Sequence, residues 1–359
     1  MKDSVKNLAS YVPPTPEDQL KQKYGLSRIV RLSANENPYG TSKKVATAVS
    51  KAVPLAENFY PDANATELRA AVVKQLAVNG QNIIFGCGLD EIITMVSRIF
   101  LTPGDEVLVA GPTFSEYQLN AEIEGAVVKT VPVDGKTGQN DLNGFLKQLT
   151  SRTKLIWICN PNNPTGGYNE VDAISQFMKQ VPNDVLVVVD EAYIDYVTDQ
   201  RPASAVGLLK QFDNLALMRT LSKAYGLASF RVGYIIMDTV RAKYMQAVRL
   251  PYNLNQLSQV AAVAAIQDQA FINDVVAKNA TERNRWAQFL DQHDLKYYPS
   301  AANFIYFQVP NAELITDQLI QSGYQVRLHQ EPNWLRVTIG TPKDNQAIQT
   351  IIERCLNDN

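Results

Sequence analysis

Five short apolar segments, each ending in small or polar residues, constrain the fold of this chain more than any other feature. The segments are NIIFGCG (82–88), EVLVAGP (106–112), KLIWICNPNNPTG (154–166), DVLVVVDEAY (184–193) and NLALMRTLSKAYG (214–226). Each is a continuous run with β-branched residues, which is typical of strands buried on both faces. Segments with helical periodicity, such as 65–78 and 90–100, alternate with them. The alternation predicts a three-layer α/β domain built on a mostly parallel sheet.

The second half of the chain indicates a further, smaller domain. A total of 359 residues is long for one hydrophobic core. A helical region over 253–293 is followed by strand candidates at 303–309 and 334–340, with a helix at 316–323 between them. We therefore expect three parts: an N-terminal arm over 1–35 that joins the small domain, a large domain over 36–260 and a small α+β domain over 261–359.

Composition excludes several functional classes. The formal net charge is -2 and the sequence pI is near 5.8, with no Lys/Arg cluster, so we expect no nucleic-acid partner. No apolar stretch is long enough to span a bilayer, and the first residues lack the apolar core of a signal peptide. Three widely spaced cysteines suit a reducing compartment, so we expect a cytoplasmic protein. Only two histidines occur, His293 and His329, and no metal site is expected.

Polar residues follow the apolar segments, where ligands bind in open α/β sheets. Gly86 and Gly88 precede a helix, whose first N–H groups can bind an anion. A tight turn with Asp90 as an ordinary helix cap explains them equally well. In NPNNPTG, the prolines restrict the residues before them and leave the Asn163 amide free to form hydrogen bonds. An ordinary Asn/Pro/Gly turn is the simpler interpretation of that segment.

Asp190 and Lys223 end two of the apolar segments. A buried carboxylate at Asp190 is costly without a partner. It either caps the next helix together with Glu191 or faces a protonated ring nitrogen, and Tyr193 could reach the same site. Lys223 lies in a loop of small residues, where desolvation or a nearby cation turns a lysine into a nucleophile. Taken alone, a surface lysine is the commoner explanation.

The residues near Asp190 and Lys223 in the sequence suggest one shared binding site. Thr220 and Ser222 supply hydroxyl groups beside Lys223, and Arg231 supplies a guanidinium that matches phosphate. An imine-forming amine, an acid for a pyridinium nitrogen and a set of phosphate donors are the parts that a pyridoxal-phosphate site needs.

Several motifs then resemble a known family. NPNNPTG (160–166), DEAY (190–193) and TLSKAYGLASFRVGY (220–234) resemble the fold type I pyridoxal-phosphate-dependent aminotransferases. RLSANENPYG (31–40), YPD (60–62), GCGLDEII (86–93) and LRVTIGT (335–341) are similar to the histidinol-phosphate aminotransferase family. The resemblance implies a homodimer with a shared active site. It also implies a role in histidine biosynthesis, converting L-histidinol phosphate and 2-oxoglutarate to imidazole-acetol phosphate and L-glutamate.

The resemblance also implies residue roles. Lys223 would bind pyridoxal 5'-phosphate covalently, and Asp190 would pair with its ring nitrogen. Asn163 and Tyr193 would form hydrogen bonds with its phenolic oxygen, and Phe114 would stack on its ring. Its phosphate would be held by Thr220, Ser222, Arg231, the turn at Gly88, Leu89 and Asp90, and Tyr60 of the other subunit. The substrate would contact Tyr11, Asn35, Arg327 and Arg336, the last of these binding the carboxylate of glutamate.

The chain departs from the family pattern in two places. Ser229 stands where members often have Gly, and the arm reads YVPPTP where YVPGKP is usual. Other enzymes with this cofactor remain open from sequence: an aromatic or broad-range aminotransferase, or a decarboxylase resembling threonine-phosphate decarboxylase. A non-catalytic ligand-binding protein on the same fold is the alternative from another class, and Lys223 with its partners argues against it.

Overall fold

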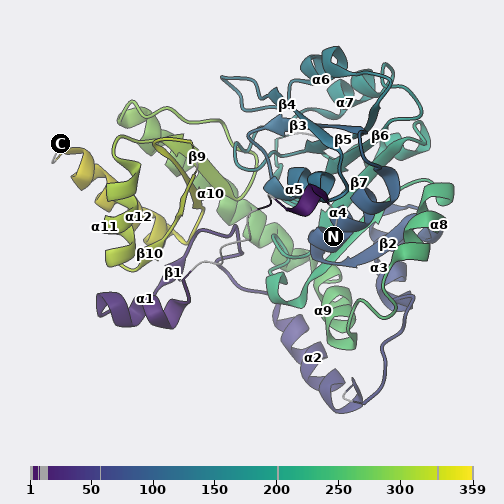
Figure 1. The fold of residues 1–359 in the computed structure, drawn as a ribbon. Coiled ribbons are helices and arrows are strands. Elements are labelled where there is room, and N and C mark those ends of the chain that lie inside the picture. Colours follow the sequence, from purple (N-terminus) through teal and green to yellow (C-terminus); the bar gives the residue numbers. More distant parts are fainter. Residues whose placement is uncertain are drawn as a thin grey trace.

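A seven-stranded sheet with the strand order β2-β8-β7-β6-β5-β3-β4 forms the centre of the larger part of the molecule (Figure 1). This computed structural model describes residues 3–6, 8, 15–56, 58–199, 202–329 and 331–357. The strands are β2 (Ile83–Cys87), β3 (Glu106–Gly111), β4 (Val127–Pro132), β5 (Thr153–Cys159), β6 (Leu186–Asp190), β7 (Leu215–Thr220) and β8 (Val232–Ile236). Only β8 runs antiparallel to its neighbours. The predicted mostly parallel sheet is confirmed.

Helices cover both faces of this sheet, which explains the continuous apolar strands. Along β5, Trp157 packs into one hydrophobic core and its neighbours Ile156 and Ile158 pack into another. The helices of this part are α2 (Lys43–Ala56), α3 (Thr66–Leu76), α4 (Gly88–Phe100), α5 (Ser115–Ile123), α6 (Leu142–Gln148), α7 (Val171–Met178), α8 (Thr239–Val248) and α9 (Gln256–Ile266). Short 3-10 helices are η1 (Asp3–Val5), η2 (Gly80–Asn82), η3 (Ile194–Tyr196), η4 (Ala205–Lys210) and η5 (Ala228–Phe230).

The smaller part contains an antiparallel sheet in the order β11-β12-β9. Its strands are β9 (Phe304–Gln308), β11 (Arg327–Leu328) and β12 (Trp334–Thr338), and its helices include α11 (Ala312–Gln321) and α12 (Pro342–Asn357). The N-terminal segment packs here: β1 (Val30–Arg31) pairs with β10 (Tyr324–Gln325), and Leu20 of α1 (Glu17–Tyr24) packs against Ile29 and Ile320.

One long helix, α10 (Gln269–Gln292), belongs to both parts. Ile272 and Val275, near its start, pack in the core of the large sheet, whereas Trp286 packs in the core of the small one. The expected division between 260 and 261 falls inside α9, whose Ala261 is buried in the large core. We therefore propose that the division lies within α10, because the two cores meet along that helix.

No single helix among the residues that the structure describes is long and apolar enough to cross a bilayer. The pair α9 and α10 meets the criteria of length and composition only when taken together, and the pair is bent by 73° at its break.

Candidate active site

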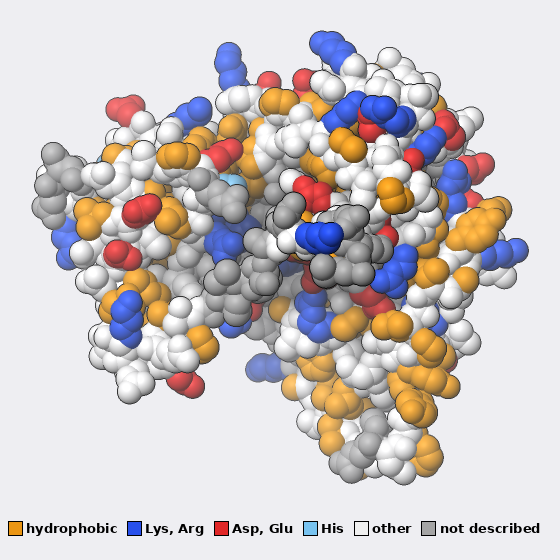
Figure 2. Space-filling view, in the orientation of Figure 1, with side chains coloured by type: hydrophobic (Ala, Val, Ile, Leu, Met, Phe, Trp, Pro, Cys, Tyr) orange, Lys and Arg blue, Asp and Glu red, His pale blue; other side chains and the backbone are white. Residues whose placement is uncertain are grey.

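A cavity of about 630 Å³ opens at the carboxyl ends of the parallel strands, between the two parts of the molecule. Figure 2 shows Lys and Arg side chains in the hollow between these parts. The structure brings most of the predicted residues to this cavity: Asn35, Leu89, Asp90, Phe114, Asn163, Asp190, Tyr193, Thr220, Ser222, Lys223, Arg231, Arg327 and Arg336. Residues as far apart in the chain as Asn35 and Arg336 thus share one site.

Lys223 lies in the loop that follows β7. Its Nζ donates a hydrogen bond to the carbonyl oxygen of Ala34 at 2.9 Å and lies 5.7 Å from the centre of the Tyr193 ring. Burial in the cavity lowers the Lys223 pKa to about 8, and the charge of Arg336 acts in the same direction. The amine is therefore available in its unprotonated, nucleophilic form close to neutral pH.

Asp190 is the last residue of β6 and is almost completely buried. Burial raises its pKa to about 6, and two hydrogen bonds oppose that rise. The Tyr117 hydroxyl donates to Oδ2 at 2.5 Å, and the Ala192 N–H donates to Oδ1 at 2.9 Å. Tyr117, on α5, was not predicted from sequence, because the bond joins residues 73 positions apart and nothing local to Tyr117 signals it.

Arg336, on β12, connects the small sheet to the large one. Its Nη1 donates to Oδ1 of Asn163 at 2.6 Å, and its Nη2 donates to the carbonyl oxygen of Ser33 at 2.6 Å. Because Asn163 accepts through Oδ1, its Nδ2 is left to donate to a bound molecule. The Arg336 Nε is buried without a hydrogen-bond partner among the described residues, so the guanidinium keeps donor capacity.

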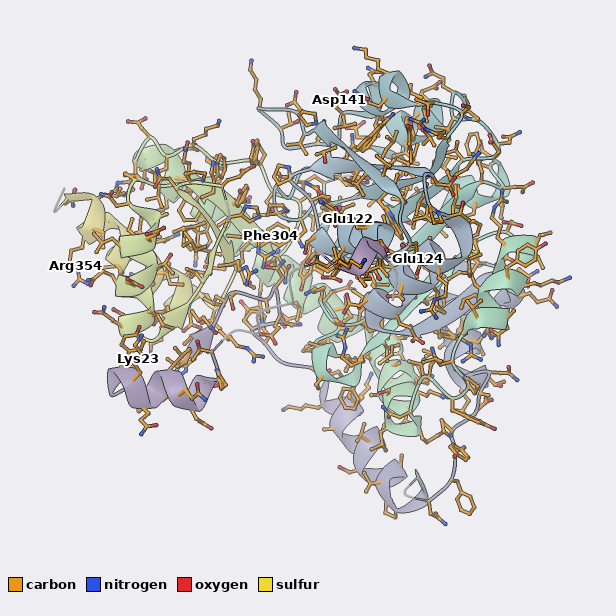
Figure 3. The ribbon with its side chains drawn as sticks, in the orientation of Figure 1. Lys23, Glu122, Glu124, Asp141, Phe304 and Arg354 are labelled. Atoms are coloured by element: carbon orange, nitrogen blue, oxygen red, sulfur yellow. The ribbon has the colours of Figure 1, made fainter. Side chains whose placement is uncertain are left out.

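Asn35 fixes the position of Tyr193. Asn35 is fully buried with a left-handed φ of 56°, and its Nδ2 donates to the Tyr193 hydroxyl at 3.0 Å. Its backbone N–H donates to Oγ1 of Thr338 on β12 at 2.9 Å, which ties the segment to the small sheet. Phe304 packs edge-on against the Tyr193 ring, with 5.0 Å between the two ring centres, and lies where the two parts of the molecule meet (Figure 3).

The first turn of α4 forms a cradle for an anion. Gly88 has a φ of 75°, a left-handed conformation that favours glycine, and a Cβ there would lie 2.3 Å from Nη2 of Arg231, so a larger residue would displace that side chain. That Nη2 contacts Oδ2 of Asp90 at 2.9 Å. The hydroxyls of Thr220 and Ser222 lie 3.0 Å apart beside them. Backbone N–H groups at a helix start, two hydroxyls and a guanidinium together match a phosphate group.

Other candidate residues lie away from the cavity. Tyr60 is 82% exposed and stacks on Tyr252 at 4.6 Å between ring centres. Tyr11 lies outside the described residues. Glu191, the predicted helix cap, is buried: it pairs with Arg219 at 2.9 Å and accepts a hydrogen bond at 2.8 Å from the N–H of Ala205, the first residue of η4.

Comparison with known proteins agrees with this geometry. Residues 27–353 match the family model for aminotransferases of class I and II. The histidinol-phosphate aminotransferase of Limosilactobacillus fermentum is 52% identical over 353 residues, which cover 98% of each chain. That of Lactiplantibacillus plantarum is 49% identical, over 98% of this chain and 99% of its own.

A solved structure has the same fold. The histidinol-phosphate aminotransferase of Sinorhizobium meliloti, in complex with pyridoxal-5'-phosphate, superimposes with a TM-score of 0.89. The match covers 100% of this chain and 98% of the other, at 24% sequence identity. The likeness therefore concerns the whole fold, including the part of the chain that forms the cavity.

Proposed function

This chain belongs to the class I and II aminotransferases, and we propose that it transfers the amino group of L-histidinol phosphate to 2-oxoglutarate. The products would be imidazole-acetol phosphate and L-glutamate, a step of histidine biosynthesis. Membership of the family makes it an enzyme that depends on pyridoxal 5'-phosphate.

The observation that carries the proposal is the pairing of two arginines with a nucleophilic lysine in one cavity. Arg327 and Arg336 lie opposite each other in the register of β11 and β12, and both line the cavity that contains Lys223. The site must accept a phosphate ester from one substrate and a second carboxylate from the other. A guanidinium binds either oxyanion by paired hydrogen bonds, so the two arginines suit both substrates.

The residues present fit the cofactor. The cradle at Gly88 and Arg231 would hold its phosphate, and Lys223 would bind it covalently. When bound, pyridoxal 5'-phosphate supplies an electron sink for the pair of electrons left at the substrate Cα. The Asp190 carboxylate would keep a proton on the ring nitrogen, and Asn163 and Tyr193 would orient the ring. Once the substrate amine has displaced it, the free Lys223 Nζ would act as the general base that takes the proton from the substrate Cα and as the general acid that delivers it to a different carbon.

Exposed aromatic side chains support a homodimer. Phe59 and Tyr60 are 74% and 82% exposed, an unusual pair of apolar rings for an isolated surface. We propose that Tyr60 of each subunit reaches the cofactor phosphate in the other. Cys87 and Cys159 are free thiols and suit a reducing compartment, so we also propose a cytoplasmic location.

A comparison of amino donors tests the proposed function. Purified enzyme is assayed with 2-oxoglutarate and either L-histidinol phosphate or L-phenylalanine, and carbon dioxide release from L-threonine phosphate is measured alongside. We expect kcat/KM for L-histidinol phosphate to exceed that for phenylalanine by roughly 100-fold, because the cavity offers paired donors to its phosphate. Equal values would favour a broad-range aminotransferase, and carbon dioxide release would favour a decarboxylase.

A matched pair of arginine variants tests the cavity itself. Arg336→Met is expected to raise KM for 2-oxoglutarate by roughly 10-fold or more, because a charge-assisted pair of hydrogen bonds is lost. Arg354→Met removes an arginine from the last turn of α12, far from the cavity (Figure 3), and should leave KM unchanged. An unchanged KM in Arg336→Met would contradict the assignment.

A further inference from the structure

Glu116 is an acidic residue in a cavity whose other charged groups are mostly cations. It is the second residue of α5, is half-buried and lines the cavity. The mechanism described above gives it no part. Its position in the first turn favours the ionised carboxylate, because the positive end of the helix dipole lies there.

Glu116 differs from the other two acids that line the cavity in having no strong partner. Asp90 is paired with Arg231, and Asp190 accepts two hydrogen bonds. For the Glu116 carboxylate, the described residues supply no ion pair and one contact, from Asn120 Nδ2 at 3.5 Å. That distance is at the outer limit of a hydrogen bond.

The orientation of Asn120 is fixed by other bonds, so it cannot move closer to the carboxylate at no cost. Its Nδ2 donates to the Glu116 carbonyl oxygen at 2.8 Å, and its Oδ1 accepts from the Thr94 hydroxyl at 2.8 Å. A carboxylate can accept about four hydrogen bonds. Glu116 therefore keeps most of its acceptor capacity for a molecule that enters the cavity.

The charge balance of Glu116 also favours a donor ligand. Burial raises the Glu116 pKa, and the negative charge of Asp90 adds to that effect. Both effects make the ionised carboxylate less favourable while no donor compensates its charge. An N–H group placed against it would supply that compensation and would be held by a charge-assisted bond.

The chemistry of the substrate identifies which N–H group this is. L-histidinol phosphate has three polar parts: an amine, a phosphate ester and an imidazole ring. The amine must reach Lys223, and the phosphate is matched by the arginines. The imidazole is the part left without an assigned partner, and its ring N–H is a donor.

We propose that Glu116 selects substrates with an imidazole ring by accepting a hydrogen bond from the ring N–H. The assignment rests on the proposed function and names the residue that would distinguish L-histidinol phosphate from a phenyl analogue of similar shape. Glu116 acts on the ring alone and has no part in proton transfer at Cα.

Binding of two unreactive ligands tests this directly. The holoenzyme is titrated with 3-(imidazol-4-yl)propionate and with 3-phenylpropionate, which lack an amine and differ only in the ring. Dissociation constants are measured for wild type, Glu116→Gln and Glu122→Gln. Glu122 lies on the same helix (Figure 3) but does not line the cavity, so its variant controls for the change of charge on α5.

We expect Glu116→Gln to weaken the imidazole ligand about 5-fold or more relative to the phenyl ligand, because the neutral amide oxygen accepts a weaker hydrogen bond than the carboxylate does. Glu122→Gln should leave both constants unchanged. A parallel loss for both ligands, or no loss for either, would overturn the proposal. The wild-type rate with L-histidinol phosphate is measured separately, so a failure of the proposed function is distinguished from a failure at Glu116.

Discussion

At the scale of single residues, the chemistry depends on the protonation state of one amine. Burial and the charge of Arg336 lower the Lys223 pKa from 10.5 to about 8, so the unprotonated fraction increases as the pH rises through 8. We predict that apoenzyme takes up pyridoxal 5'-phosphate increasingly fast between pH 7 and 9, with a midpoint near pH 8. Stopped-flow absorbance in the visible range measures this rate.

A charge variant provides the control for that profile. Arg336→Met removes the second cause of the lowered Lys223 pKa, so its midpoint should move to higher pH. Arg354→Met changes the same residue type on α12 and should not move it. A wild-type midpoint at pH 10 or above would mean that the cavity does not desolvate Lys223.

Asp190 gives a second prediction, in which stability and activity change in opposite directions. Its folded-state pKa of about 6 lies above the ordinary 3.8, so the folded protein loses stability as the pH rises from 3.8 to 6. The full penalty, about 3 kcal/mol, is present above pH 6. Asp190→Asn apoenzyme should therefore be more stable than wild type at pH 8, with little difference at pH 4.

The same variant should be nearly inactive. A neutral amide cannot keep a proton on the ring nitrogen, so we expect transamination to fall by roughly 100-fold or more. Denaturant unfolding at pH 4 and pH 8 measures the predicted change in stability, and a steady-state assay measures the predicted loss of activity. Wild-type activity in Asp190→Asn would remove Asp190 from the reaction.

At the scale of secondary-structure elements, the start of α4 depends on the absence of a side chain. Gly88→Ala would strain a left-handed backbone and bring a Cβ to 2.3 Å from Arg231, which must move. We predict that the affinity for pyridoxal 5'-phosphate falls by roughly 10-fold or more, because the guanidinium leaves the cradle. Equilibrium dialysis measures this affinity.

Gly25→Ala is the matched control for the backbone effect. Gly25 is also left-handed, with φ 64°, but nothing lies within 4 Å of the added Cβ. It ends α1, far from the cradle, so its variant should lose about 1 kcal/mol of stability and keep the cofactor affinity of wild type. Equal losses of affinity in both variants would show that strain alone accounts for the effect at Gly88.

The elements also show how far the sequence could predict this molecule. Continuous apolar runs identified β2, β3, β5, β6 and β7, because both of their faces are buried. β4 was missed because it is an edge strand with exposed positions such as Val127. The antiparallel strand β8 was also not predicted as a strand. The site residues at strand ends were predictable from local motifs. Tyr117 was not, since its role arises only when α5 packs against β3 and β4 and its hydroxyl reaches Asp190 at the end of β6.

At the scale of the whole molecule, the proposed dimer makes each site depend on two chains. Tyr60 would complete the site of the other subunit. Each site would therefore take its Lys223 from one subunit and its Tyr60 from the other, and Lys223→Ala and Tyr60→Ala each remove one of these two residues. In a mixed dimer of these two variants, one site carries both defects and the other carries neither. We therefore predict that the two variants, unfolded together and refolded, regain activity that neither shows alone.

The expected recovery follows from symmetry. Random pairing makes half of the dimers mixed, and one site in each mixed dimer is intact, so activity should reach about a quarter of wild type. Lys223→Ala refolded with Asp190→Asn is the control. Both residues belong to the site of their own subunit, so every site in such a mixture carries one defect. We expect this mixture to recover no activity. Absence of recovery in the Tyr60 mixture, with mixed dimers demonstrated by mass spectrometry, would show that Tyr60 serves its own subunit or none.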